Sequence, residues 1–140
     1  MATIKQFEDL DSWKKSRTLC DEIFKHCAIK PFASDFELKN QIIRSSGSIM
    51  DNIAEGFERG SKGEFITFLG YAKGSAGEVR SQLYRAKDRN YLSEKEFDVL
   101  FKEITDISKM LSGFITYLNN ANVRGERHKS TLNIKPKTLN

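Results

Sequence analysis

Apolar residues recur at spacings of three and four along most of the chain, which is the period of an amphipathic helix. Between residues 35 and 58 these positions are Leu38, Ile42, Ile49, Ile53 and Phe57. Alternation with a period of two, which a half-buried strand requires, appears nowhere in the sequence. The pattern therefore predicts an all-α fold.

The same spacing defines three further helical segments, at about 9–28, 62–89 and 94–119. Their apolar stripes are, in order, Leu10, Trp13, Cys20, Ile23, Phe24 and Cys27; Phe65, Phe68, Leu69, Ala72, Ala76, Val79, Leu83 and Ala86; and Phe97, Leu100, Ile104, Ile107, Leu111, Phe114 and Leu118. In the segment at 62–89, which is the third in chain order, the stripe keeps heptad spacing, and this favours packing against neighbouring helices at a small angle.

Capping signals punctuate the chain between these segments. Three capping boxes are predicted, at Ser34 with Glu37, Ser61 with Glu64, and Ser93 with Glu96. Gly60 and Asn90 suit the left-handed position that ends a helix. Because the connections are short, residues 1–120 are predicted to form an antiparallel up-and-down four-helix bundle, followed by a flexible tail at 121–140.

Composition agrees with one helical domain. The chain has 140 residues, of which 39% are hydrophobic and 30% charged. No apolar run reaches the roughly 18 residues of a membrane span, and the first residues lack the apolar core of a secretory signal. We therefore expect a cytoplasmic protein with no membrane partner. Cys20 and Cys27, two helical turns apart, are expected to be core residues of a reducing compartment rather than a disulfide.

The net charge of +4 lies entirely in the tail. Residues 121–140 hold five basic side chains and one acidic side chain, whereas residues 1–120 hold equal numbers of each. Arg124, Arg127 and Lys129 are therefore candidate contacts to nucleic acid, whose phosphates bind clustered cations.

A second basic cluster lies near the end of the third segment, interleaved with tyrosines: Arg80, Tyr84, Arg85, Lys87, Arg89 and Tyr91. Cations beside aromatic rings can hold phosphates and stack bases. The alternative is that these cations only complement the negative end of the helix dipole. The four basic residues are candidate nucleic-acid contacts.

Small residues form a separate stripe on the third segment, at Gly70, Gly74, Gly77 and Ser81. Each glycine inside a helix costs about 1 kcal/mol relative to alanine, so a compensating close approach by another helix is expected. The neighbour is either a helix of the same chain, for example at residues 45–48, or a second subunit. The spacing does not decide between these.

Asn52 and Glu55 share one face of the second segment, and Glu78 on the third can approach that face. The alternative is a solvated surface with local ion pairs worth little.

Catalytic signals are lacking. Neither His26 nor His128 follows a glutamate by three residues, as a di-iron bundle requires, and no Gly-rich phosphate loop, H-E-x-x-H or C-x-x-C motif occurs. We expect no enzyme, no cofactor and no metal site.

Four motifs occur in a familiar order: residues 7–13 (FEDLDSW), 41–49 (QIIRSSGSI), 52–56 (NIAEG) and 72–78 (AKGSAGE). In these motifs the chain resembles the four helix bundle protein family, also called the ribosomal RNA intervening-sequence protein family, over about residues 7–120. The resemblance implies a bacterial homopentamer. It also implies that the small-residue stripe is a subunit interface, and that Asn52, Glu55 and Glu78 form a structural polar network. The fold is similar to that of the accessory protein of diversity-generating retroelements, although here the body of the chain is charge-neutral.

Two functions from different classes follow as hypotheses. The first is a non-enzymatic, oligomeric, RNA-associated bundle that binds nucleic acid through basic helix ends and the tail. The second is a protein–protein scaffold or adaptor that makes no direct contact with nucleic acid.

Overall fold

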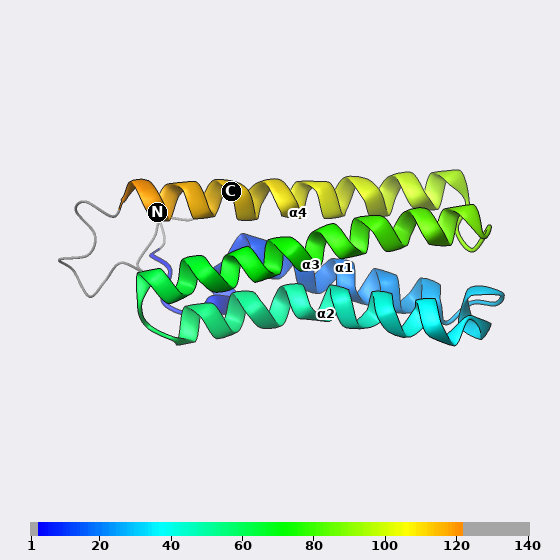
Figure 1. Cartoon of the computed structure of the whole chain (residues 1–140), viewed down its shortest axis with the longest axis horizontal. Helices are drawn as coiled ribbons and strands as arrows, with labels where there is room; N and C mark the ends of the chain where they lie inside the picture. Colours follow the sequence, from blue (N-terminus) through cyan, green and yellow to red (C-terminus); the bar gives the residue numbers. More distant parts are fainter. Residues whose placement is uncertain (1–2, 122–140) are drawn as a thin grey trace.

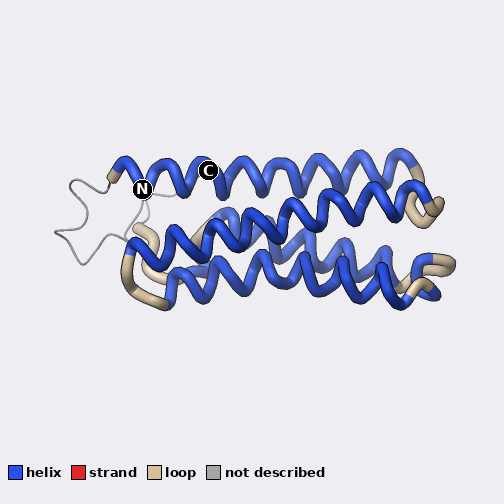
Figure 2. The backbone as a smooth tube through the Cα atoms, in the orientation of Figure 1, coloured by secondary structure: helices blue, strands red, loops and turns tan. Residues whose placement is uncertain are grey.

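The computed structural model describes residues 3–121, which form four long helices and two short 3-10 turns (Figures 1 and 2). The elements are η1 (Phe7–Asp9), α1 (Asp11–Cys27), η2 (Phe32–Ser34), α2 (Phe36–Glu58), α3 (Lys62–Asp88) and α4 (Glu94–Asn120). No strand occurs among these described residues. The all-α prediction is confirmed, and the predicted helix bounds differ from the observed ones by at most two residues.

The four helices form an up-and-down bundle in which each helix runs antiparallel to the one before it (Figure 1). Contacts are most extensive between α2 and α3, and α4 returns to lie against α1 with the smallest contact among neighbouring helices. The predicted topology is therefore confirmed. The polar side chains described below lie on two outer surfaces of the bundle, one between α2 and α3 and the other between α3 and α4.

The helix caps agree with the sequence at two of three predicted boxes. Ser93 and Glu96 form the complete box, with each side chain bonded to the backbone N–H of the other residue. The hydroxyl oxygen of Ser61 accepts from the Glu64 N–H at 3.2 Å and caps α3. The Ser34 prediction is wrong: α2 begins one residue later, because the carboxylate of Asp35 accepts from the backbone N–H of Leu38.

The two predicted helix ends are confirmed by backbone conformation. Gly60 has φ of 82° and Asn90 has φ of 62°, so both lie in the left-handed region. These are the residue types that adopt that conformation with least strain. The turns after α2 and α3 follow from them.

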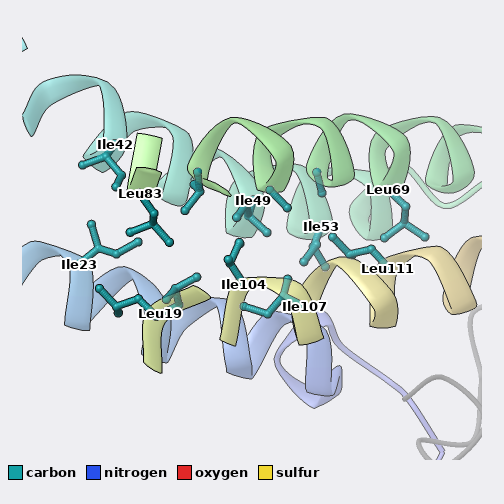
Figure 3. Close-up of a cluster of buried hydrophobic side chains, with 14 of the residues drawn as sticks. Leu19, Ile23, Ile42, Ile49, Ile53, Leu69, Leu83, Ile104, Ile107 and Leu111 are labelled. Carbon is teal, nitrogen blue, oxygen red and sulfur yellow. The ribbon is translucent and has the colours of Figure 1, made fainter. Parts of the chain in front are cut away.

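Apolar side chains from all four helices meet along the bundle axis (Figure 3). Leucine and isoleucine dominate, and each contributes about 1.5–3 kcal/mol when fully buried. The fully buried positions shown are Leu19, Ile23, Ile42, Ile49, Ile53, Leu69, Leu83, Ile104, Ile107 and Leu111. The apolar stripes predicted for α2 and α4 are buried throughout.

The stripe predicted for α1 needs correction. Phe24 is 60% exposed, while Leu19, which the prediction omitted, is buried together with Ile23 and Cys27. Those three residues are spaced by four and therefore share one face, whereas Phe24 is turned away from it by about 100°. In α3, Phe68 is only partly buried.

Helices α2 and α3 pack tightly beside Gly56, near the turn that joins them. A Cβ at Gly56 would lie 2.6 Å from the Cβ of Phe68 and 3.1 Å from the ring of Phe65. No side chain larger than hydrogen fits there without displacing α3. The lack of a side chain at Gly56 therefore allows α3 to pack closely against α2 at this point.

None of the helices in residues 3–121 has the length and apolar character needed to cross a bilayer.

Candidate nucleic-acid interface

The four cations predicted near the end of α3 lie on two sides of the helix. Arg80 and Lys87 lie toward α4, over aromatic rings of that helix. Arg85 and Arg89 lie toward the start of α2 and bond to its side chains. The structure therefore divides the predicted cluster into two pairs with different surroundings.

The pair toward α2 is engaged within the chain. Arg85 Nη1 donates to Gln41 Oε1 at 2.8 Å, and its Nη2 lies 3.9 Å from Glu37 Oε1. Arg89 Nη1 donates to Asp35 Oδ2 at 2.8 Å. These contacts fasten the end of α3 to the start of α2, so the two guanidinium groups are already occupied.

Asp35 is the centre of this attachment. Its carboxylate caps α2 through the Leu38 N–H and also accepts from the Tyr91 hydroxyl at 2.8 Å. The hydrogen bond from Leu38 has the largest effect in holding the pKa of Asp35 below its ordinary value, and the hydrogen bonds from Tyr91 and Arg89 lower it further. The partner of Arg89 is therefore ionised at neutral pH.

The pair toward α4 has a different environment. Arg80 lies 5.6 Å from the ring centroid of Phe101, and Lys87 lies 4.5 Å from that of Phe97. Tyr84 lies between Arg80 and Lys87 in the sequence. Its ring centroid is 5.2 Å from the ring centroids of both phenylalanines. Tyr84 is 50% exposed, whereas Phe97 is buried beneath it.

We call Arg80, Tyr84, Lys87 and Phe101 the cation–aromatic face. Within residues 3–121 neither of its cations forms an ion pair. Each is therefore available to a phosphate, while the exposed ring of Tyr84 offers a surface on which a base can stack. Charge and aromatic surface are combined here as single-stranded RNA recognition requires.

The remaining predicted nucleic-acid contacts, Arg124, Arg127 and Lys129, lie outside the described residues.

The small-residue stripe faces away from the bundle. Gly70, Gly74 and Gly77 are exposed, and a Cβ at any of them would meet no atom of the described residues within 4 Å. Within residues 3–121, no helix therefore approaches the three glycines closely enough to be the intramolecular neighbour. Ser81 is also exposed and lies on the rim of a groove between α2 and α3.

The three residues predicted as a polar network lie along α2 and α3 but are not joined. Asn52 Nδ2 donates to the backbone oxygen and the hydroxyl of Ser48, at 2.8 and 2.9 Å. Glu55 pairs with Arg59 at 3.0 Å. In the part of the chain described, no hydrogen bond connects Glu78 to Asn52 or Glu55, and Glu78 lines the groove instead.

Sequence reasoning missed the residues that do connect α2 and α3. Ser75 Oγ donates to Ser48 Oγ at 3.0 Å, and Gln82 Nε2 donates to Ser45 Oγ at 3.1 Å. The run of small polar residues at 45–48 was the available signal. Its small size suggests room for a close helix, whereas its hydroxyl groups form the hydrogen bonds to α3.

Among the described residues, the side chains most relevant to catalysis are Cys27 and His26. Burial raises the pKa of the Cys27 thiol to about 11, so this cysteine is not a thiolate at neutral pH. His26 lies 3.9 Å from Glu96 at the surface between α1 and α4. Within residues 3–121 no three His, Cys, Asp or Glu side chains come together as metal ligands.

The chain is similar to known proteins in both sequence and structure. The family model described as "23S rRNA-intervening sequence protein" matches residues 8–113. No curated protein matches the chain. A crystal structure from Bacteroides thetaiotaomicron, described as a protein with unknown function from the S23 ribosomal protein family, is 26% identical with a TM-score of 0.69. The alignment covers 74% of this chain and 97% of that one.

Proposed function

This chain belongs to the 23S rRNA-intervening sequence protein family, and from that premise we propose that it is a non-enzymatic, RNA-associated helical bundle. The cation–aromatic face is the proposed contact to single-stranded RNA, with Arg80 and Lys87 on phosphates and Tyr84 stacked against a base. Because ribosomal RNA is cytoplasmic, the proposal places the chain in the cytoplasm.

One observation carries the proposal: two cations that have no ion-pair partner among residues 3–121 flank a half-exposed tyrosine on one side of α3. A cation that served only the helix dipole would not need an aromatic neighbour. The basic tail, with Arg124, Arg127 and Lys129, is proposed to add further phosphate contacts.

Anisotropy of a labelled single-stranded RNA tests the proposal. Neutralising the free pair, in Arg80→Gln/Lys87→Gln, is expected to weaken binding by about 100-fold, because two charge-assisted hydrogen bonds of about 1.5 kcal/mol each are lost. The matched double variant Lys25→Gln/Arg59→Gln removes equal charge from side chains that are each held in an ion pair and lie outside the cation–aromatic face, so its effect on RNA binding is smaller. Equal losses in the two variants would contradict the assignment.

We also propose that the chain forms a homo-oligomer, with a pentamer expected, through Gly70, Gly74, Gly77 and Ser81. These glycines forgo about 1 kcal/mol each relative to alanine, and nothing within residues 3–121 uses the space they leave. Light scattering is expected to give a multiple of the 16.0 kDa subunit mass. A strict monomer would contradict self-association.

The scaffold alternative makes a different prediction. Its partner protein would survive nuclease treatment in a pull-down, whereas a partner held through RNA would be released.

A further inference from the structure

A polar groove of about 480 Å³ runs between α2 and α3, on the opposite side of α3 from the cation–aromatic face. Its lining comes from two of the motifs that carry the family resemblance and from the turn of α3 that follows: Gln41, Arg44, Ser45, Ser48, Glu78, Ser81, Gln82 and Arg85. Segments more than 30 residues apart in sequence thus supply one continuous set of hydrogen-bonding side chains. The volume is within the range of small-ligand sites.

The two walls of the groove carry opposite free charges. Arg44 on α2 and Glu78 on α3 are both exposed and both line the groove. Neither forms an ion pair anywhere in the described chain, and they do not pair with each other. An occupant can therefore meet a cation on one side and an anion on the other.

The floor of the groove contains a buried acceptor without a donor. Gln82 is only 8% exposed, and its Nε2 donates to Ser45 Oγ. Its Oε1 has no hydrogen-bond partner among the described residues. Buried side-chain acceptors are almost always satisfied by a protein group or by water, so this oxygen is expected to accept from a water or from a donor group of an occupant of the groove.

The floor also offers a donor. Ser48 Oγ accepts hydrogen bonds from Asn52 Nδ2 and from Ser75 Oγ. With both lone pairs occupied, its own O–H is left to donate. Together with Arg44 and the exposed Ser81, it forms a set of donors suited to an anion.

This combination excludes simple occupants. An inorganic anion would leave Glu78 and Gln82 Oε1 facing negative oxygens, and a simple cation would be repelled by Arg44. A sugar phosphate carries both required groups, since its phosphate is anionic and its vicinal hydroxyls are donors. Carboxylates commonly accept hydrogen bonds from ribose hydroxyls in nucleotide-binding proteins.

We infer that the α2–α3 groove binds a ribose phosphate, with Arg44 and Ser48 on the phosphate and Glu78 and Gln82 on the ribose hydroxyls. The source is either a nucleotide unit of bound RNA or a free ribose phosphate. The RNA source rests on the proposed function and adds selection of RNA over DNA, because only RNA has the 2′-hydroxyl.

The test compares a short single-stranded RNA with the DNA of the same sequence on wild type and Glu78→Gln. Wild type is expected to prefer RNA by about tenfold, the worth of a hydrogen bond to a charged acceptor. Glu78→Gln is expected to lose most of that preference while binding DNA as well as before or better, since a negative charge near the phosphates is removed. Asp88→Asn makes the same charge change on the exposed end of α3, outside the groove, and should keep the preference.

A second arm uses ribose 5-phosphate and 2-deoxyribose 5-phosphate, followed by thermal shift. Stabilisation by ribose 5-phosphate and not by 2-deoxyribose 5-phosphate supports the groove even if no RNA binds. This stabilisation should be lost in Arg44→Gln and kept in Arg17→Gln, which changes an exposed arginine of α1 outside the groove. The proposed function would then fail while the inference holds.

The reverse outcome, in which the proposed function holds and the groove inference fails, is also distinguishable. If RNA binds but its preference over DNA is the same in Glu78→Gln and Asp88→Asn, the groove assignment is overturned and the cation–aromatic face is unaffected. Light scattering gives a further check. If Glu78→Gln or Arg44→Gln changes the mass of the oligomer without loss of RNA preference, the groove contacts another subunit and the groove assignment is overturned.

Discussion

Gly56 lies so close to Phe68 that a Cβ on the glycine would stand 2.6 Å from the Cβ of the phenylalanine. This contact joins the carboxyl end of α2 to the second turn of α3. Phe65, which faces the same glycine, also packs edge-on against Phe57 and Phe114 with centroids 5.8 and 5.1 Å apart. The absence of a side chain at one residue thus sets the position of an aromatic cluster that spans three helices.

Gly56→Ala is therefore expected to destabilise the bundle by about 1–3 kcal/mol, the usual effect of overpacking a tight contact. Gly47→Ala is the control, because it lies in the same helix and a Cβ there meets nothing within 4 Å. That change should be neutral or stabilising by up to about 1 kcal/mol. Urea denaturation measures both, and equal stabilities would contradict the packing described for Gly56.

The capping of α2 gives a second comparison. Asp35→Ala removes the side chain that accepts from Leu38 and holds Arg89 and Tyr91, so the melting temperature is expected to fall. Ser34→Ala should leave it nearly unchanged, because Ser34 lies before the cap. A larger loss from Ser34→Ala would restore the capping box predicted from sequence.

The sequence predicted the helices well because their signals are local. Ser61, Ser93, Gly60 and Asn90 act on the backbone within a few residues of themselves, and each was placed correctly. The pattern of Ser34 and Glu37 also fits a box, but the adjacent Asp35 is an equally good cap. Local pattern alone does not rank two competing caps.

Relationships between distant residues were less accessible. The bonds of Arg85 to Gln41 and of Arg89 to Asp35 span 44 and 54 residues, so nothing near either arginine marks it as engaged. The glycines of α3 were correctly identified as unusual, but the spacing could not show that they face outward. Gly56 was noticed only as part of a motif, although a glycine inside a helix and next to an aromatic residue was a usable signal.

The exposed glycines provide the test of self-association. Gly74→Leu is expected to leave the helical content and thermal stability of the subunit intact, because no atom of the part of the chain that the structure describes occupies the space near Gly74. It should nevertheless reduce the sedimentation coefficient, since a second subunit could no longer approach. Gly113→Leu, at an exposed glycine of α4, is the matched control and should sediment like wild type. Normal assembly of Gly74→Leu would remove the stripe from the interface.

The contact between α1 and α4 contains an acidic pair. Burial, followed by the hydrogen bond and charge of Glu22, raises the pKa of Glu103 from its ordinary 4.5 to about 7. Lys15 on α1 opposes this shift and Asp106 on α4 adds to it. The folded chain thus binds this proton more tightly than the unfolded chain does.

Stability is therefore expected to decrease as the pH rises from about 4.5 to about 7, because Glu103 must then ionise beside Glu22. Glu103→Gln keeps a neutral group at this position and should flatten that part of the profile, with its gain over wild type largest above pH 7. Denaturation at several pH values measures the effect, with Asp98→Asn on the exposed side of α4 as control. A Glu103→Gln profile parallel to that of wild type would show that the carboxyl ionises without penalty.

The central claim is that single-stranded RNA lies on the side of α3 that faces α4, and photochemical cross-linking tests it most directly. Ultraviolet irradiation of the complex, followed by mass spectrometry of the peptides, should find nucleotide adducts at Tyr84, because its half-exposed ring offers the stacking surface. The Arg80→Gln/Lys87→Gln variant should lose these adducts. Cross-links confined to peptides outside α3 and α4 would contradict the account.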